Sequence, residues 1–267
     1  MNGNIDSELK LNQQELLTEI QSEPGISEIL PKILATDNIT LSDAQLSAFA
    51  SYAALLRDWN TRINLTAITD SHGIAVRHFL DSLSLLPLID NETARQGRES
   101  LKIIDVGTGA GFPGLPLRIV RPELKLTLLD SLQKRINFLE AVITELKLAD
   151  VLTISSRAED AAHDGHYREK FDLATARAVA PMPVLCEYLL PFVRPGGLMV
   201  AMKAQKTDEI DADAKAIRLL GGELETVKQF ILSGTDLNRT LICVRKKGRS
   251  PSIFPRKAGT PGRKPLV

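Results

Sequence analysis

The chain has 267 residues, of which 43% are hydrophobic and 25% are charged, a composition typical of a globular protein and not of a disordered one. Lys plus Arg and Asp plus Glu both total 33, so the net charge is zero. No apolar run reaches the ~18 residues of a membrane span, and the N-terminus lacks a signal-peptide core. Cys186 and Cys243 are too few for a disulfide framework or a zinc cage. We expect a cytoplasmic protein of one or two domains with no membrane segment and no metal site.

Residues 1–98 are predicted to form an N-terminal helical region. Apolar residues recur at helical spacing through LSDAQLSAFASYAALL, with Ser42 and Gln45 in capping-box positions. Asp70 or the residue after it can cap a further helix that ends at Pro87. The polar stretch 90–100 is typical of a loop. Residues 1–35 are acidic and weakly patterned, and their role stays open.

From residue 99 the pattern changes to short apolar runs separated by helical stretches, which predicts a mostly parallel sheet. We expect strands near 101–106, 124–130, 151–155, 171–176, 197–203, 223–232 and 239–246. The last two are too close in sequence for a crossover helix and predict an antiparallel hairpin at one edge. The predicted fold class is therefore α/β, a doubly wound sheet with an antiparallel edge strand. Ligands of such sheets bind beyond the carboxyl ends of the strands.

The first predicted strand ends in the glycine-rich stretch DVGTGAGFPG. Gly107, Gly109 and Gly111 allow a tight turn and a close approach of backbone to ligand, which predicts a cofactor-binding loop. With Asp130 at the end of the second strand, the loop also fits a dinucleotide, so it does not by itself choose between NAD and another adenosine cofactor. Asp105 would repel a pyrophosphate and favours a cationic amino-acid portion, as in S-adenosylmethionine. A nicotinamide dehydrogenase is kept as the alternative.

Further candidates follow the next three strands. Arg157, Arg177 and Lys203 should surround the mouth of the pocket, where they can bind phosphates. Arg177 can instead form a structural ion pair, and Lys203 can be an ordinary solvated lysine. Glu159 lies where an adenine edge is expected, but it can also close a capping box with Ser156.

Two kinds of chemistry that use S-adenosylmethionine require residues that this sequence lacks. The segment ARAVAP after the fourth strand is not the Asn/Asp-Pro-Pro-aromatic loop typical of enzymes that methylate exocyclic amines. Cys186 lies in an apolar helix and is interpreted as a core thiol, which disfavours a cysteine nucleophile. His72 and His78 fall outside the cofactor domain, and His163 and His166 fall in a polar loop. We assign no histidine a catalytic role.

The C-terminal end is strongly basic. Residues 245–267 carry eight basic residues and no acid, so residues 1–244 carry a net charge of −8. The basic residues lie among Pro, Gly and Ser, which predicts a flexible basic tail over 248–267. Such a tail is either a solubilising segment or an arm that binds the phosphates of a nucleic acid.

The stretches IIDVGTGAGFPGLPL, LTLLDSLQKRINFL, SRAED, FDLATARAVAP and RPGGLMVAMK closely resemble the class I methyltransferases of the RsmG family, also called glucose-inhibited division protein B. The stretches WNTRINLTAI, VRHFLDSL and FPRKAGTPGRKPL resemble the same family. The resemblance implies a Rossmann-like methyltransferase domain over 99–247 that uses S-adenosylmethionine. It also implies methylation of guanine N7 in 16S ribosomal RNA, with that RNA or a small-subunit assembly intermediate as partner.

The family's cofactor contacts, placed on the matching positions, are Gly107, Phe112, Ala158, Glu159 and Arg177. Position in the fold adds Gly109 in the loop and Asp130 for the ribose. Guanine N7 is an exposed lone pair, so methyl transfer needs no base and positioning should supply most of the rate. Arg157, Arg177 and Lys203 are the candidate catalytic residues, which can bind RNA phosphates or the guanine edge. A non-catalytic RNA-binding protein is the less favoured alternative, because the glycines and Asp105 are intact.

Overall fold

The computed structural model describes residues 24–177, 180–204 and 210–266. Residues 1–23 of the predicted helical region and the last residue of the predicted tail lie outside this description. Within the described residues no helix is long and apolar enough to cross a membrane.

The described strands form one sheet in the order β3-β2-β1-β4-β5-β7-β6. They are β1 (Lys102–Val106), β2 (Lys125–Asp130), β3 (Val151–Ser155), β4 (Phe171–Arg177), β5 (Val193–Lys203), β6 (Gly222–Ile231) and β7 (Asn238–Lys246). Strands β1 to β5 pair in parallel, and β7 pairs antiparallel with both β5 and β6. The predicted fold class, including the antiparallel hairpin, is confirmed. Strand β5 begins four residues earlier than predicted.

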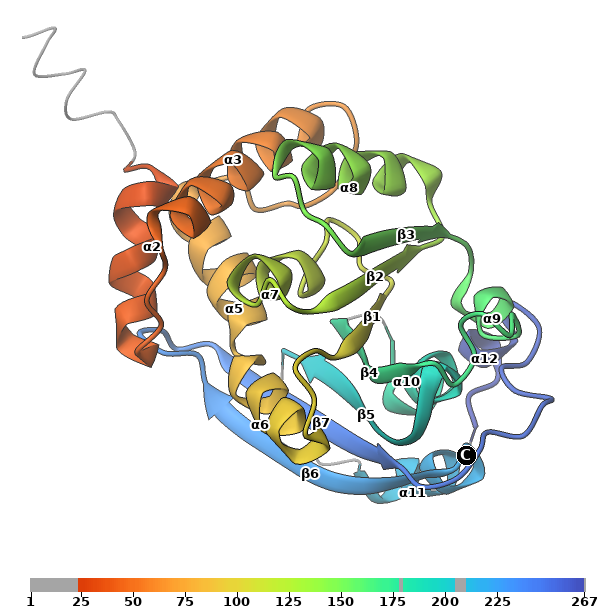
Figure 1. Cartoon of the computed structure of the whole chain (residues 1–267). Coiled ribbons are helices and arrows are strands. Elements are labelled where there is room, and N and C mark those ends of the chain that lie inside the picture. The colour runs from red at the N-terminus through yellow and green to blue at the C-terminus, as the bar shows by residue number, and fades with distance from the viewer. Residues whose placement is uncertain (1–23, 178–179, 205–209, 267) are drawn as a thin grey trace, which may run out of the picture.

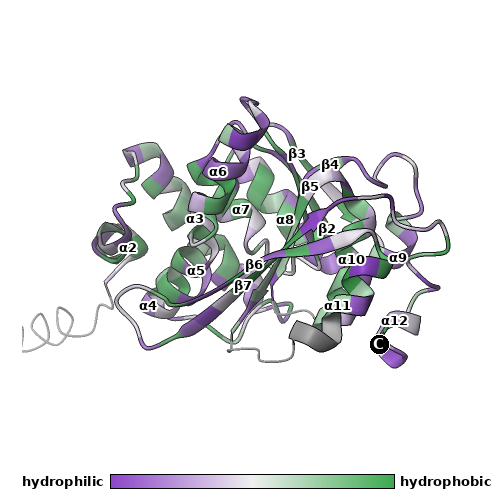
Figure 2. Ribbon diagram, turned by 90° about the horizontal axis from the view of Figure 1, so that it is seen from below, coloured by the Kyte–Doolittle hydropathy of each residue, from purple (hydrophilic) through white to green (hydrophobic). Residues whose placement is uncertain are grey.

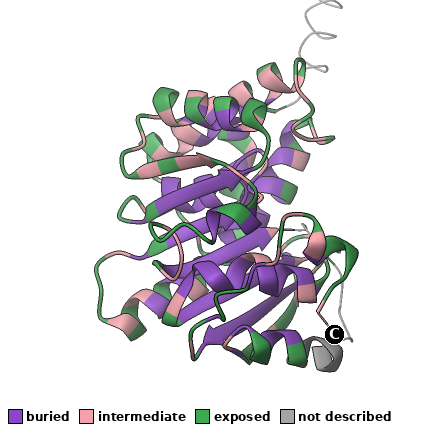
Figure 3. Ribbon diagram, turned by 90° about the vertical axis from the view of Figure 1, so that its right-hand side faces the viewer, coloured by how far each residue is buried: buried purple, intermediate pink, exposed green. Residues whose placement is uncertain are grey.

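Alternate side chains along the strands point to opposite faces of the sheet, and each face is covered by helices. One face packs against α2 (Ile26–Leu34), α3 (Asp43–Asn60), α7 (Gly114–Val120) and α8 (Gln133–Glu145). The other packs against α9 (Ala158–Ala161), α10 (Met182–Leu189) and α11 (Ile210–Leu219). Figure 1 shows this three-layer arrangement, Figure 2 the hydrophobic residues of α7 inside it, and Figure 3 the buried central strands.

The first helical segments confirm two predicted caps. Ser42 Oγ accepts from the Gln45 backbone N–H while Gln45 Oε1 accepts from the Ser42 N–H, so α3 begins with the capping box. Asp70 Oδ1 accepts from the Gly73 N–H and starts a continuous helical run. The run comprises α4 (Ser71–Gly73), the π-helix η2 (Ile74–Leu80) and α5 (Asp81–Leu83). Turns of π-helix are frequent at functional sites.

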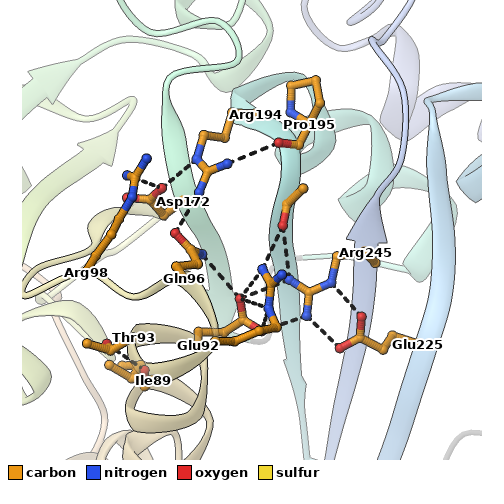
Figure 4. Close-up of polar contacts among 12 residues, drawn as sticks. Ile89, Glu92, Thr93, Gln96, Arg98, Asp172, Arg194, Pro195, Glu225 and Arg245 are labelled. Atoms are coloured by element: carbon orange, nitrogen blue, oxygen red, sulfur yellow. Dashed lines mark hydrogen bonds and ion pairs between the residues drawn. The ribbon is translucent and has the colours of Figure 1, made fainter.

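The prediction of a loop over 90–100 is wrong for most of that stretch. Helix α6 runs from Leu86 to Gln96, with Pro87 in its first turn and Gly97 in the left-handed conformation at its end (φ 59°). The stretch is polar because its charged groups bind partners distant in sequence. Glu92 is buried and accepts from both terminal nitrogens of Arg245 on β7, over 2.6 and 2.9 Å. Figure 4 shows this ionic cluster, which joins α6 to the sheet.

The C-terminal segment, predicted from its composition to be a flexible tail, packs against the rest of the chain. Arg168 donates to the carbonyl oxygens of Ser250, Pro251 and Phe254, and the Phe254 side chain is buried. Arg256 pairs with Glu187 on α10 over 2.6 Å. The segment ends beyond the short helix α12 (Thr260–Arg263), which Figure 1 shows beside α9. These contacts with residues distant in sequence hold the segment in place, and its composition alone does not predict them.

Candidate functional site

The glycine-rich loop follows β1 and has the backbone conformation that glycine favours. Gly107, Gly109 and Gly111 have φ values of 68°, 61° and 94°. A Cβ on Gly109 would meet nothing within 4 Å, whereas one on Gly111 would lie 2.7 Å from the Tyr52 Oη. Gly111 therefore permits packing against α3, and Gly109 borders open space where a ligand can approach.

Asp105, at the end of β1, is fully buried beneath the loop. Its Oδ2 accepts from Thr108 Oγ1 over 2.7 Å and from the Gly114 N–H over 2.9 Å. Its Oδ1 is buried without a hydrogen-bond partner among the described residues. Burial raises the pKa of this carboxyl to about 6. A buried oxygen of this kind costs free energy unless a donor or cation reaches it, so this atom is suited to a cationic ligand group.

Asp130, at the end of β2, holds the other side of the loop. Its Oδ2 accepts from the Gly109 N–H over 3.0 Å, and its Oδ1 accepts from the Leu132 N–H over 2.9 Å. Arg135 forms an ion pair with it over 3.2 Å. A carboxylate has about four acceptor positions, so these contacts leave capacity for a ligand hydroxyl. The structure thus brings Asp130 to the glycine loop as the sequence predicts.

Phe112 lies at the centre of a contact between the loop and the N-terminal helices. The His78 ring stacks on it with the centroids 4.5 Å apart and the planes at 14°. The Arg177 guanidinium carbon lies 5.0 Å from the same ring centroid. Two residues that the resemblance assigns to the cofactor are therefore adjacent, and His78 is their neighbour.

His78 lies outside residues 99–247, as the sequence predicts, but its contact with the glycine-rich loop could not be expected from the sequence. Its Nδ1 lies 3.3 Å from Arg177 Nη2, and its Nε2 lies 2.9 Å from Thr66 Oγ1. Burial, together with the Arg177 charge, lowers the His78 pKa to about 4, so the ring is neutral at pH 7. His78 lies in VRHFLDSL, one of the stretches that resemble the family, and this was the sequence signal that could have placed it near the site.

Asp81 and Arg239 are two further residues that the sequence analysis did not single out. Asp81 accepts from Arg177 Nη1 over 3.2 Å and from Arg239 Nε over 2.6 Å. The ion pair considered for Arg177 is thus present, and it forms at the candidate site. Arg177 and Lys203 line one cavity of about 210 Å³, as the sequence analysis expects of residues at the carboxyl ends of neighbouring strands. Lys203 Nζ also donates to the Ala180 carbonyl oxygen.

The segment after β3 is arranged differently from the capping-box alternative. Ser156 Oγ donates to the Arg157 carbonyl oxygen, and Glu159 Oε1 accepts from the backbone N–H of Gly259 over 2.8 Å. Glu159 and Ala158 are buried, whereas Arg157 is exposed at the start of α9. Arg157 is not among the residues that line the cavity shared by Arg177 and Lys203.

A family model and two relatives point to one family. A family model described as rRNA small subunit methyltransferase G matches residues 45–239. A relative from Acetivibrio thermocellus, named Ribosomal RNA small subunit methyltransferase G, is 46% identical over 229 residues, which is 86% of this chain and 92% of the relative. A relative of the same name from Desulfitobacterium hafniense is 48% identical over 231 residues, 86% and 93% of the two chains.

Among solved structures, the bifunctional kinase-methyltransferase WbdD is similar with a TM-score of 0.52 and 18% identity. The likeness covers 72% of this chain and 46% of that one. At this identity it shows the fold alone.

Proposed function

The chain belongs to the rRNA small subunit methyltransferase G family, and from this premise we propose that it transfers a methyl group from S-adenosylmethionine to N7 of a guanine in 16S ribosomal RNA. One observation carries the choice of cofactor. Asp105 Oδ1 is a buried oxygen without a hydrogen-bond partner among the described residues, on the strand that leads into the glycine loop. A sulfonium and an ammonium group suit this environment, and a pyrophosphate does not.

The residues of the loop fit S-adenosylmethionine, which supplies an electrophilic methyl group when bound. In the proposal, the backbone of Gly107 and Gly109 and the Asp105 carboxylate bind the methionine portion, and the Phe112 ring forms a wall of the pocket. Asp130 accepts from the ribose hydroxyls. Ala158 and Glu159 bind the adenosine through a backbone amide and a carboxylate, the latter held by Gly259.

Positioning is the main contribution that we assign to the protein in methyl transfer. Guanine N7 carries a lone pair and no proton, so no general base is required, and His78, with its pKa lowered to about 4, would be a weak one. We assign Arg177 and Lys203 to holding the RNA beside the cofactor, because both line the same cavity at the carboxyl ends of β4 and β5. Arg157 is assigned to RNA binding at the exposed start of α9. Correct alignment of the reacting atoms can by itself lower a barrier by several kcal/mol.

The proposed partner is 16S rRNA, free or in a small-subunit assembly intermediate. Lys257, Arg263 and Lys264 are exposed on the C-terminal segment, which is attached to Glu159 through Gly259. These cations extend the proposed RNA surface around the adenosine side of the site. We keep residues 99–247 as the methyltransferase domain and residues 1–98 as the N-terminal helical region, whose described part, residues 24–98, packs against one face of the sheet.

The test is transfer of a labelled methyl group from S-adenosylmethionine to 16S rRNA, followed by mapping of the modified nucleotide. We expect 7-methylguanine at one position with the parental protein. Arg177→Ala and Lys203→Ala should reduce the transfer rate far more than they lower the melting temperature. A protein that binds S-adenosylmethionine and methylates no ribosomal RNA would contradict the proposal. Binding of NAD in preference to S-adenosylmethionine would favour the dehydrogenase instead.

A further inference from the structure

A small cationic cavity lies beside the candidate cofactor site. It has a volume of about 210 Å³ and lies between η2 and the ends of β4, β5 and β7. Four basic side chains line it: Arg77, Arg177, Lys203 and Arg239. They come from four different elements, so only the tertiary fold brings these charges together.

The acidic residue in the lining does not neutralise this charge. Asp81 is the one carboxylate among the lining residues, and each of its oxygens already accepts from a guanidinium group. The His78 ring is uncharged at pH 7, because its pKa is lowered to about 4. The lining side chains therefore carry a net charge of +3. Asp81 orients Arg177 and Arg239 and leaves the cavity positive.

This lining offers hydrogen-bond donors in excess of acceptors. A guanine base would need acceptors for its N1–H and its exocyclic amine, and Asp81 is the one carboxylate in a lining with four basic side chains. A phosphodiester needs only donors and positive charge. We propose that the cavity binds a backbone phosphate of the RNA next to the target guanine, with Arg77 and Arg239 as ligands that none of the assignments above includes. The inference rests on the proposed function and adds a subsite to it.

Arg177 connects this phosphate subsite to the cofactor loop. Its guanidinium lies over the Phe112 ring at 5.0 Å, and its Nη1 donates to the Arg77 carbonyl oxygen over 3.0 Å. A phosphate bound in the cavity is therefore held by the same arginine that contacts the loop. The subsite would fix one nucleotide against the cofactor pocket and leave the neighbouring base to enter it.

Arg77→Ala is the most direct test, because Arg77 is exposed and its structural contact to Arg177 uses the backbone carbonyl. The measurement is kcat/KM for methyl transfer to 16S rRNA, free and in small subunits that lack the modification, at several salt concentrations. Loss of one phosphate contact should reduce kcat/KM roughly three- to tenfold and the magnitude of its log–log salt slope by about 0.7. Arg239→Ala should have a similar effect. S-adenosylmethionine affinity of Arg77→Ala, measured by calorimetry, should be unchanged.

Lys125→Ala is the matched control, because Lys125 is an exposed basic residue at the opposite, amino-terminal end of the parallel strands. It should keep the parental rate and salt slope. Equal losses in Lys125→Ala and Arg77→Ala would overturn the subsite in favour of diffuse attraction. A parental slope in Arg77→Ala, or loss of cofactor affinity in it, would also overturn the subsite. If Arg239→Ala does not fold, Arg77→Ala alone decides. A parental protein that methylates no RNA would instead refute the proposed function itself.

Discussion

The backbone N–H of Gly259 donates a hydrogen bond to Glu159 Oε1 over 2.8 Å. Glu159 is buried at the start of α9, and Gly259 belongs to the C-terminal segment, 100 residues further along the chain. A second contact of the same kind joins the Arg256 backbone N–H to Glu187 Oε1 over 2.7 Å. The C-terminal segment therefore holds the carboxylate that we assign to the adenosine.

We predict that deletion of residues 248–267 weakens S-adenosylmethionine binding and lowers the melting temperature. The deletion removes the donor to Glu159 and leaves buried Glu187 without Arg256, and an unpaired buried charge is strongly destabilising. Calorimetric titration and thermal melting measure the two effects. A truncated protein with the parental cofactor affinity and melting temperature would show that the segment has no role in the site.

The companion variant keeps the packing and removes only exposed charge. Replacing Lys257, Arg263 and Lys264 by alanine should leave S-adenosylmethionine affinity unchanged, because these side chains are exposed. If all three contact RNA phosphates, the salt slope of RNA binding should fall by about 2, at roughly 0.7 per contact. Identical slopes in variant and parent would identify them as ordinary solvated charges.

Gly109→Val should abolish S-adenosylmethionine binding in a protein that still folds. Gly109 has φ 61°, which strains a β-branched residue, and the added side chain would occupy the open space beside the loop. Gly97→Val is the control, since Gly97 has φ 59° and equally open surroundings at the end of α6. Both variants should lose a similar amount of stability, and only Gly109→Val should lose the cofactor. Near-parental affinity in a folded Gly109→Val protein would contradict the placement of the pocket.

The affinity for S-adenosylmethionine should fall as the pH is lowered from 7 to 5. The Asp105 pKa is raised to about 6 by burial, and a cationic ligand requires the ionised carboxylate, so binding must displace a proton below that pH. The loss should approach tenfold per pH unit below about 6. His78, with a pKa of about 4, stays neutral over this range. Calorimetry at several pH values checks this, and a flat profile would contradict the role of Asp105.

Asp105→Asn should weaken cofactor binding and stabilise the ligand-free protein at pH 7. Because the folded-state pKa is raised, the contribution of Asp105 to stability is fully present below about pH 4 and is lost as the pH rises through about 6. At pH 7 the ligand-free Asp105→Asn protein should therefore be more stable, by at most about 3 kcal/mol. Its affinity for S-adenosylmethionine should be weaker and nearly independent of pH. Denaturant unfolding of the variant and parent at pH 5 and 7 measures the difference.

Glu92→Ala should destabilise the fold by about 3–5 kcal/mol, because it removes the buried one of the two carboxylates that pair with the buried Arg245. Glu223→Ala is the matched control. It removes an exposed ion pair with Lys247, and such pairs contribute about 0–1 kcal/mol. Urea unfolding of both variants measures the contrast. Equal small losses would show that the cluster in Figure 4 contributes little to stability.

Local sequence patterns were sufficient to predict the sheet and the glycine loop. Strand positions follow from short apolar runs, and the αL conformations of Gly107, Gly109 and Gly111 follow from the absence of a Cβ. The start of α3 follows from the Ser42 capping box, whose partners are three residues apart. The loop conformation and the helix cap depend on interactions within a few residues of chain, and each strand's position follows its local apolar run, so the amino-acid sequence alone determines these features.

Tertiary contacts decided the features that the sequence analysis missed. His78 and Asp81 precede Arg177 by almost 100 residues, yet both contact it at the site. Glu92 lies in a polar stretch that forms a helix, with Arg245 on β7 as its partner, and the basic C-terminal segment is fixed through Glu159. A polar group is buried only where a distant partner satisfies its charge or hydrogen bonds, and the position of that partner is set by the fold.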